Sequence, residues 1–414
     1  MSNGHGEDLS GALLGKTLLN LGHQLEALPL VGHGHAYTEA GIKILGQAKA
    51  FSTGGLGYTS FRGRLTELLQ GQVFYLLRRL GRLLQVADHY DLLVVIGDVI
   101  PVMAAWLSCR PVAIYLVAYS SHYEGRLRLP WPCGSCLKSK RFLGVYSRDE
   151  LTATDLTAQL QRPVSFLGNP FMDPVLTPQA RLPSCRYRLG LLPGSRLPEL
   201  EHNLLLLLAM VEYLPEQLLA RDEISLDLAL VPALDDSSLA QLVAQQGWQM
   251  QPGIGNATHT KLVLGQRHIT LQRNCFIAVL QSSDLLISMA GTATEQAVGL
   301  AKPVLQLPGM GPQFTAAFAE AQRRLLGPTV FCAGGKPGEA LNLQNTAKLT
   351  LELLKRSQAD PDLQQQCQKQ ALQRLGVAGG GQRLAQAITN LLTERHQCQL
   401  LLPIPNGNSG WTDC

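Results

Sequence analysis

The sequence has few charged residues and no long apolar run. Charged side chains make up 16% of the 414 residues, whereas 46% are hydrophobic. This composition excludes a largely disordered chain, because such chains are poor in hydrophobic residues and rich in charge. The longest fully apolar stretch, residues 204–211, is far shorter than the ~20 residues that span a bilayer. We therefore expect a globular protein of two or a few domains with no membrane-spanning helix.

The sequence also lacks a secretory signal and a disulfide framework. No basic segment followed by an apolar segment opens the chain. The nine cysteines, an odd number, are scattered from Cys109 to Cys414, which is typical of reduced cytosolic thiols. Cys133-Gly-Ser-Cys136 has the spacing of a redox or zinc motif, but no second cysteine pair follows it. We therefore predict a cytoplasmic protein without a metal site.

The net positive charge comes entirely from the first part of the chain. The formal net charge is +4, and all of this excess falls within residues 1–168, most densely within 60–146. Here an arginine-containing, leucine-rich helical pattern at 62–85 is followed by a basic cluster at 126–141 around Trp131. Two interpretations stay open: a helix packed on its sheet with a solvated basic edge, or a surface that lies on an anionic membrane. Nucleic acid is a poor fit, because the net charge is small and aromatic residues are not interleaved with the basic ones.

Short apolar strands alternate with helical stretches along the chain. The pattern predicts strands at 91–96, 111–117, 142–146 and 164–167 and helices at 62–87 and 148–160 in the first half. In the second half it predicts strands at 187–192, 224–231, 267–271, 284–288 and 303–307 and helices at 199–213, 236–247, 274–281, 292–299 and 314–325. Such alternation implies parallel sheets covered by helices, and hence an α/β protein of two Rossmann-like, doubly wound domains.

We place the domain boundaries from composition and turn signals. Residues 1–168 form the first domain and 169–360 the second, with the crossing at Gly168-Asn-Pro170. Residues 361–402 read as terminal helices that pack back on the first domain, and 403–414 as a loose tail.

One strand is missing from the pattern. Asn3 to Asp8 should form the loop after the first strand, yet only Met1 and Ser2 precede it. Either the sheet lacks its opening strand, which would leave neighbouring backbone groups unpaired, or the sequence starts late.

A turn of small residues in the second half has the features of a diphosphate site. The strand-like Ser283–Ser288 runs into Ala290-Gly291-Thr292, after which a helix begins. The N–H groups and the positive dipole end of such a helix start attract an anion. Glu295 can accept hydrogen bonds from two ribose hydroxyls, although it also fits a first-turn acid matched to the dipole. We assign to the donor site Gly291, Thr292, Thr294, Glu295 and Gln296, with hydroxyl contacts from the two threonines.

A second turn, Leu191-Leu-Pro-Gly-Ser-Arg196, again joins a strand to a helix. Arg196 can donate two hydrogen bonds to phosphate oxygens and stabilise the negative charge that develops as a nucleotide diphosphate leaves. The alternative is a surface ion pair with Glu199 or Glu201, which would contribute little. Because such a turn lies at the carboxyl edge of a sheet, where α/β folds bind ligands, we favour the phosphate role for Gly194, Ser195 and Arg196.

Together the two turns resemble the donor-nucleotide half of a GT-B-type glycosyltransferase. More widely, the chain resembles the related branch of the lipid-A-disaccharide synthase family, through Asn3–Asp8, Val95-Ile-Gly-Asp98, Phe166–Asp173 and Pro312-Gln-Phe-Thr315. Two departures matter. The family's Gly-Glu-x-Ser-Gly-Asp loop is Gly-His-Gly-Glu-Asp here, and of its two aspartates around the second loop only Asp98 remains, with Val102 near the other position.

The resemblance implies two domains facing a cleft, with Asn169 and the loop of Gly311 and Gln313 on its walls. It implies inverting transfer of an N-acetylglucosamine-type sugar from a UDP-sugar to an acylated sugar or other lipid acceptor, with no metal or further cofactor. Two alternatives stay open: a UDP-sugar epimerase of the same architecture, and a non-catalytic nucleotide-sugar-binding protein.

Glycosyl transfer needs a base, because the acceptor hydroxyl must lose a proton. Asp98, at the end of an apolar strand, is the first choice, and His5, Glu7 and Asp8 are the alternatives. Asp98 fits a helix N-cap almost equally well. Because an acylated acceptor stays in the bilayer, we also expect residues 60–146 to contact the inner face of an anionic membrane.

Overall fold

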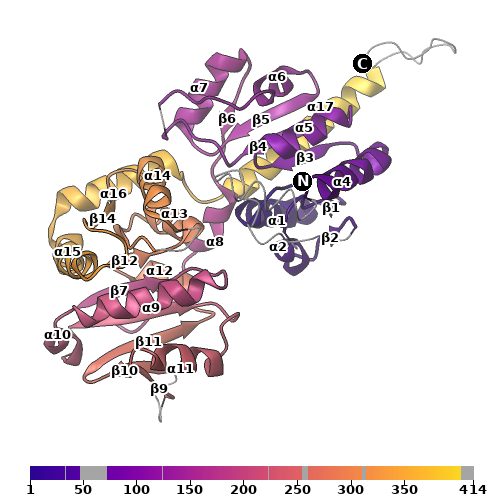
Figure 1. Cartoon of the computed structure of the whole chain (residues 1–414). Coiled ribbons are helices and arrows are strands. Elements are labelled where there is room, and N and C mark those ends of the chain that lie inside the picture. Colours follow the sequence, from indigo (N-terminus) through magenta and orange to yellow (C-terminus); the bar gives the residue numbers. More distant parts are fainter. Residues whose placement is uncertain are drawn as a thin grey trace. The chain divides into compact units, whose positions relative to one another are not determined.

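The computed structural model describes residues 1–32, 34–46, 72–123, 125–221, 223–253, 260–309 and 314–401. They form two compact units (Figure 1): the first contains Met1–Asp173 and the chain from Val377 onward, and the second contains Pro174–Gly376. Each unit has a sheet of mainly parallel strands flanked by helices, so the predicted α/β fold of two Rossmann-like halves is confirmed. Each unit is described by itself below.

The first unit contains a four-stranded parallel sheet and a two-stranded parallel pair. The four strands lie in the order β3 (Leu93–Ile96), β4 (Val112–Leu116), β5 (Phe142–Ser147) and β6 (Ser165–Phe166). The pair consists of β1 (Glu26–Ala27) and β2 (Lys43–Ile44). Strands β3 and β4 are runs of apolar side chains with helices packed against the sheet, which is typical of parallel strands.

Met1 and Ser2 take the place of the opening strand. Ser2 forms parallel bridges with both Pro29 and Ile96. The Leu30 N–H donates to the Ser2 carbonyl at 2.8 Å, and the Ile96 N–H donates to the Met1 carbonyl at 2.8 Å. The neighbouring backbone groups that we expected to be unpaired are therefore bonded, and two residues link the β1–β2 pair to the larger sheet.

The helices of the first unit include the two predicted at 62–87 and 148–160 and several that were not predicted. They are α1 (His5–Asn20), α2 (His35–Glu39), α4 (Gln72–Val86), α5 (Val99–Leu107), α6 (Cys133–Lys138), α7 (Glu150–Leu160) and α17 (Gly380–Leu401), with short 3-10 turns η2 (Ala87–His89) and η3 (Pro170–Met172); α8 (Asp173–Leu176) begins at the end of its N-terminal segment.

Helix α4 supports the structural interpretation of the leucine-rich pattern. Leu83 is buried, and Leu76 and Leu80 pack against the core. Arg79 is also buried, and it donates to the carbonyls of Leu45 and Pro29 at 2.6 Å each. Arg79 is thus part of the fold and is not available to a membrane surface. Residues 62–71 of the predicted helix lie outside the described residues.

The second unit is an eight-stranded sheet in the order β14-β13-β12-β7-β8-β11-β10-β9. The strands are β7 (Tyr187–Leu192), β8 (Ile224–Leu230), β9 (Gln249–Gln251), β10 (Lys261–Leu264), β11 (Arg267–Arg273), β12 (Leu285–Ser288), β13 (Val304–Gln306) and β14 (Val330–Cys332). The expectation of a wholly parallel sheet is wrong at one edge, where β10 is antiparallel to β11 and to β9. The reason is local: Gly265, at φ +59, and Gln266 make a two-residue turn, and so short a turn joins only antiparallel strands.

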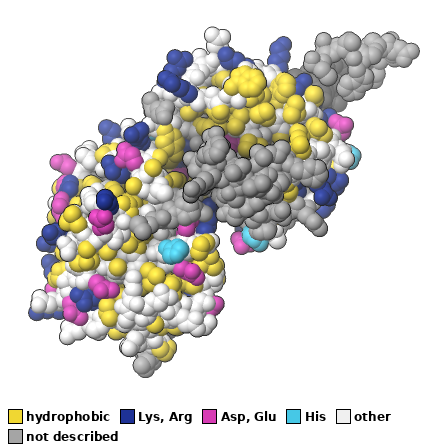
Figure 2. All heavy atoms as spheres, in the orientation of Figure 1, with side chains coloured by type: hydrophobic (Ala, Val, Ile, Leu, Met, Phe, Trp, Pro, Cys, Tyr) yellow, Lys and Arg dark blue, Asp and Glu magenta, His cyan; other side chains and the backbone are white. Residues whose placement is uncertain are grey.

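The second unit's helices surround one apolar core. They are α9 (Glu199–Glu212), α10 (Glu216–Ala220), α11 (Asp236–Ala244), α12 (Phe276–Ser282), α13 (Gly291–Gly299), α14 (Ala316–Leu326), α15 (Ala340–Ala359) and α16 (Pro361–Arg374). Helix α9 buries Leu200, Leu204, Leu207, Leu208 and Val211, a helical spacing that lays one face on the sheet. On the face shown in Figure 2, basic and acidic side chains are interspersed over this unit.

The two terminal helices belong to different units. Helix α16 packs against α13, α14 and α15, whereas α17 packs along α1 and η3 of the first unit. The expectation that all of 361–402 returns to the first domain is therefore wrong for α16. The boundaries between the two units lie at residues 173/174 and 376/377, whereas we expected them at 168/169 and 360/361. Residues 403–414 lie outside the described residues.

Candidate functional site

The turn after β7 has the expected strand-to-helix geometry. Strand β7 ends at Leu192 and α9 begins at Glu199. Gly194 has a φ of +102, which favours glycine, and it leads into an exposed Ser195 and a half-buried Arg196. The turn therefore places a guanidinium group at the carboxyl end of a central strand.

The turn after β12 lies beside it. Strands β12 and β7 are parallel neighbours, with Ser288 opposite Leu192, and the Met289 N–H donates to the Leu192 carbonyl at 2.9 Å. Helix α13 begins at Gly291, and its N-cap residue, Ala290, provides no side-chain cap. The structure thus brings both predicted turns to one edge of the sheet, with the amino end of α13 at one of them.

Asn203 joins the two turns, and the sequence reasoning missed it. From α9, its Nδ2 donates to the Pro193 carbonyl at 2.9 Å and approaches the Met289 carbonyl at 3.5 Å. A Cβ added at Gly309, after β13, would lie 2.9 Å from the Asn203 Oδ1. Asn203 therefore contacts the carboxyl ends of three strands. The available signal was an amide directly before a run of leucines.

Two residues assigned to the donor site are buried instead. Thr294 is fully buried, with its hydroxyl 2.6 Å from the Ala290 carbonyl and 2.7 Å from the Ser288 Oγ. Gln296 is also buried. The expected ligand contact of Thr294 is therefore wrong, because its hydroxyl stabilises the turn from within. Gly291, Thr292 and Glu295 are partly exposed.

Two hydrogen-bonded glutamines stabilise the turn at the start of α13. The Gln322 Nε2 donates to the Gly291 carbonyl at 3.0 Å, and the Gln306 Nε2 donates to the Gln322 Oε1 at 2.9 Å. Both side chains are buried. Neither was anticipated, because the pair joins β13 and α14 to α13 across the fold.

Of the three residues expected on the cleft walls, Asn169 is among the described residues. Asn169 is fully buried; its Oδ1 is hydrogen-bonded to the Tyr115 hydroxyl, and its Nδ2 donates to the Arg148 carbonyl at 3.0 Å. The expectation that Asn169 faces an open cleft is therefore wrong. Gly311 and Gln313 lie outside the described residues.

Asp98, in the first unit, lies at the carboxyl end of β3 and caps α5. Its Oδ1 accepts from the Ile100 N–H at 3.0 Å, and its Oδ2 accepts from the Asn3 Nδ2 at 2.9 Å. Burial raises the pKa of Asp98, and these two hydrogen bonds oppose that rise only in part. The side chain is thus an N-cap and also a carboxylate more basic than an ordinary aspartate.

The alternative bases lie near the start of α1. A Cβ added at Gly97 would lie 3.3 Å from the Glu7 Cγ, so the partly exposed Glu7 is next to the end of β3. Asp8 is buried and accepts from the Ser2 Oγ at 2.6 Å, and burial raises its pKa to about 6. The prediction of Asp8 as an alternative base is therefore wrong, because its carboxylate is buried away from any acceptor. The His5 side chain lies outside the described part of α1.

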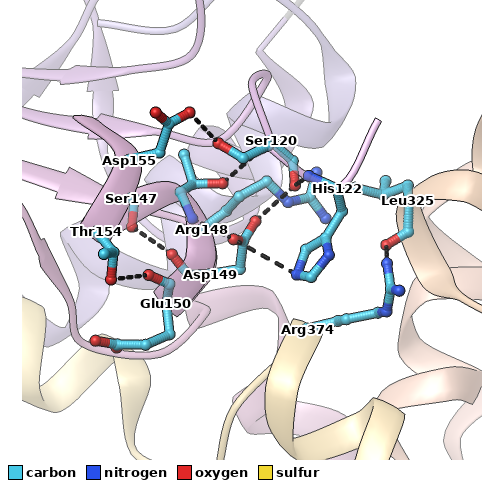
Figure 3. A network of polar contacts seen from close by, with 12 residues as sticks. Ser120, His122, Ser147, Arg148, Asp149, Glu150, Thr154, Asp155, Leu325 and Arg374 are labelled. Carbon is cyan, nitrogen blue, oxygen red and sulfur yellow. Dashed lines mark hydrogen bonds and ion pairs between the residues drawn. The ribbon is translucent and has the colours of Figure 1, made fainter. Parts of the chain in front are cut away.

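A histidine–carboxylate pair that sequence reasoning missed lies at the same edge of the sheet (Figure 3). Asp149 caps α7 and accepts from the Thr152 N–H at 2.8 Å and from the Ser120 Oγ at 2.7 Å. The His122 Nε2 lies 3.8 Å from the Asp149 Oδ1. An imidazole beside a buried carboxylate can take up and release a proton. The signal was present, since both residues follow predicted strands.

The loop that carries His122 also reaches the helix that Asp98 caps. The hydroxyl of Tyr119 accepts from the Val99 N–H at 3.1 Å, at the first residue of α5. Asp98, Tyr119 and the His122–Asp149 pair therefore follow three adjacent parallel strands, β3, β4 and β5. This is the edge where α/β folds place their ligands.

In the described part of the chain, no group of three or more His, Cys, Asp or Glu side chains could hold a metal ion. None of the helices searched there is long and apolar enough to cross a bilayer.

Solved structures have a similar fold over nearly the whole chain. A putative UDP-N-acetylglucosamine 2-epimerase from Listeria monocytogenes matches with a TM-score of 0.54 at 16% identity, over 95% of this chain and 96% of that one. The S. aureus MnaA-UDP co-structure matches with a TM-score of 0.53 at 16% identity, over 95% of this chain and 96% of that one. The glycotransferase of kitacinnamycin matches with a TM-score of 0.52 at 16% identity, over 94% of this chain and 97% of that one. The chain has the GT-B-type fold.

At this identity the similarity of the GT-B-type neighbours shows the fold alone. They include epimerases as well as glycosyltransferases, and none of the three is a lipid-A-disaccharide synthase. No family model matches the sequence, and no curated protein matches it.

Proposed function

We propose that the second unit binds a UDP-sugar at the paired turns after β7 and β12. The observation that carries this proposal is their adjacency at one sheet edge, with Arg196 on one turn and Gly291 and Glu295 on the other. UDP is the nucleotide to test first, because it is named for one solved structure of the same fold.

Each group has a defined task at this site. The diphosphate lies at the amino end of α13, where backbone N–H groups and the helix dipole stabilise negative charge. Arg196 donates to phosphate oxygens and stabilises the charge that develops as UDP leaves. The Glu295 carboxylate accepts from the two ribose hydroxyls.

The reaction that we propose first is inverting glycosyl transfer of an N-acetylglucosamine-type sugar. The acceptor oxygen forms a bond to the anomeric carbon, the bond from that carbon to the phosphate oxygen breaks, and the acceptor proton passes to a base in the first unit. Asp98 is the first candidate, because burial makes it more basic than usual. We propose an acylated sugar or another lipid as acceptor, which residues 60–146 would approach at an anionic membrane.

Epimerisation of the UDP-sugar is the second candidate. Enzymes of this fold include a putative UDP-N-acetylglucosamine 2-epimerase, and the first unit offers two proton-transfer groups, Asp98 and the His122–Asp149 pair. Elimination and re-addition of UDP would use a proton-transfer group at each stage. This reaction needs no acceptor.

One incubation separates these functions. The protein is mixed with UDP-N-acetylglucosamine, with and without a lipid extract, and UDP release and the sugar products are measured. Acceptor-dependent release of UDP supports transfer, and an epimer formed without acceptor supports epimerisation. Binding without either product would leave a nucleotide-sugar-binding protein.

We expect Glu295→Ala and Arg196→Ala each to weaken UDP binding by about 5- to 150-fold, which corresponds to the ~1–3 kcal/mol of a charge-assisted hydrogen bond. Calorimetric titration with UDP measures this. The controls are Glu352→Ala and Arg221→Ala, which remove the same charges from exposed positions of the second unit. Unchanged UDP affinity in a folded Glu295 variant would remove the donor-site assignment.

A further inference from the structure

The first unit has a cavity of about 560 Å³ that contains no residue assigned to UDP binding or to proton transfer. The loop before α6, α6 itself and the end of α7 line it. Its charged and large apolar lining residues are Arg126, Leu127, Arg128, Leu129, Lys138 and Leu160.

The lining of this cavity is positive. Arg126, Arg128 and Lys138 contribute three cations, and no lining residue is acidic. All three side chains are exposed, and none forms an ion pair with a carboxylate among the residues that the structure describes. Three cations around one cavity repel each other, and an anion bound there would remove that repulsion.

Side chains of α7 hold the loop that carries the two arginines in place through hydrogen bonds. Asp155 accepts from the Leu127 N–H at 2.6 Å, and the Gln159 Nε2 donates to the Leu127 carbonyl at 2.9 Å. Burial opposes ionisation of Asp155, but hydrogen bonds from Gln159, Leu127 and Ser121, together with the positive charge of Arg126, outweigh it and lower its pKa. The carboxylate is thus ionised and engaged, and the cavity is formed before any ligand arrives.

The surroundings of the cations are apolar. Leu127, Leu129 and Leu160 contribute to the lining, and the neighbouring Trp131 is 89% exposed. In Figure 2, basic and hydrophobic side chains gather over the region of α6 and α7. An exposed indole next to cations and leucines suits the boundary between a charged headgroup and acyl chains.

We propose that this cavity binds a phosphate group, carried either by an acidic phospholipid headgroup or by a soluble phosphate compound. Two guanidinium groups and an ammonium group can donate to several phosphate oxygens at once. The proposal does not rest on the donor site, which lies in the other unit.

Trp131 provides the reporter for the test, and a Trp131→Phe variant identifies its share of the fluorescence. One probe is inorganic phosphate, and the other is vesicles of phosphatidylcholine and phosphatidylglycerol in equal amounts, with phosphatidylcholine vesicles as reference. The cavity variant combines Arg126→Gln, Arg128→Gln and Lys138→Gln. The matched control combines Lys16→Gln, Lys43→Gln and Arg221→Gln, which removes the same charge from exposed positions outside residues 60–146.

We expect a saturable change in Trp131 fluorescence with the wild type and the control, and an affinity weaker by about two orders of magnitude in the cavity variant. A response to inorganic phosphate assigns a soluble ligand, and a response only to anionic vesicles assigns a headgroup. No saturable response to either probe, or equal losses in the two triple variants, would overturn the proposal. UDP affinity, measured in parallel, should stay unchanged in both variants, so failure of the donor site is detected separately.

Discussion

Asp98 shows how one side chain can serve the fold and still be available for chemistry. It caps α5 through the Ile100 N–H, and burial raises its pKa. Asn caps helices as well as Asp does, but an amide cannot take up the acceptor proton. The conservative substitution therefore separates the two roles.

We expect Asp98→Asn to lower turnover by about 10²-fold or more while UDP affinity and the free energy of unfolding stay close to wild type. Steady-state kinetics, calorimetry and chemical denaturation measure the three quantities. Asp235→Asn, at the N-cap of α11 in the second unit, is the control and should leave turnover unchanged.

Near-normal turnover of Asp98→Asn would move the base elsewhere. His122→Gln then becomes the informative variant, because the His122–Asp149 pair lies two strands along the same sheet edge. Glu7→Gln is the remaining test on α1.

Asp8 gives a prediction on pH. Burial raises its pKa from 3.8 to about 6, so the folded protein binds this proton more tightly than the unfolded chain does. Its contribution to stability is therefore fully present below about pH 4 and is lost as the pH rises to about 6.

For Asp8→Asn, the free energy of unfolding relative to wild type should rise between pH 4 and pH 7 by an amount on the order of 3 kcal/mol. Urea denaturation at several pH values measures this. Asp88→Asn removes an exposed carboxylate, so its free energy of unfolding should change with pH in parallel with that of the wild type. Parallel curves for Asp8→Asn as well would contradict the raised pKa.

At the scale of secondary-structure elements, the donor site depends on how α9 ties strand ends together. Asn203 bonds to the Pro193 carbonyl and approaches the Met289 carbonyl, on the two turns that carry Arg196 and Glu295. Removing its amide leaves buried carbonyls without a partner and frees one turn to move relative to the other.

Asn203→Ala should lower the free energy of unfolding by about 1–3 kcal/mol and weaken UDP binding as well. Asn345→Ala removes an exposed amide that donates to the Gly334 carbonyl, away from both turns, and should leave UDP affinity unchanged. Full UDP affinity in a folded Asn203→Ala protein would show that the turns keep their positions without it.

At the scale of the whole molecule, the chain leaves the first unit and returns to it through α17. The Asp173 carboxylate accepts from the N–H groups of Gly379, Gly380 and Gly381 at 2.8–3.0 Å, which caps α17. Gly380 lies against backbone, and a Cβ there would come within 2.6 Å of the Gly168 carbonyl carbon and the Asn169 nitrogen. The return of the chain therefore requires glycine at this position.

We expect Gly380→Ala to lower the free energy of unfolding by about 1–3 kcal/mol, because the rigid backbone of Gly168 and Asn169 must move. Gly81→Ala, at a position of α4 where a Cβ meets nothing within 4 Å, should be neutral or stabilising by up to ~1 kcal/mol. Equal stability of the two variants in urea denaturation would show that α17 is loosely docked.

Much of the element pattern was predictable because hydrophobic periodicity is local. The strand expected at 187–192 has those bounds, and the helix expected at 292–299 begins one residue earlier. Strands β9 and β14 were missed because each has three residues that are mostly not buried, whereas all three residues of the equally short β13 are buried. Helix α15 was missed because its buried face includes Thr346 and Thr350, which read as polar in sequence.

The sequence by itself determined the α/β class and the two strand–turn–helix segments, because each depends on neighbouring residues only. Tertiary structure decided which strands are neighbours, and so it alone placed β12 beside β7 and His122 beside Asp149. It also decided that Thr294 and Asn169 face the interior, whereas Glu295 is partly exposed. The physical reason is that strand order and side-chain burial arise from packing between segments far apart in the chain, which no local pattern records.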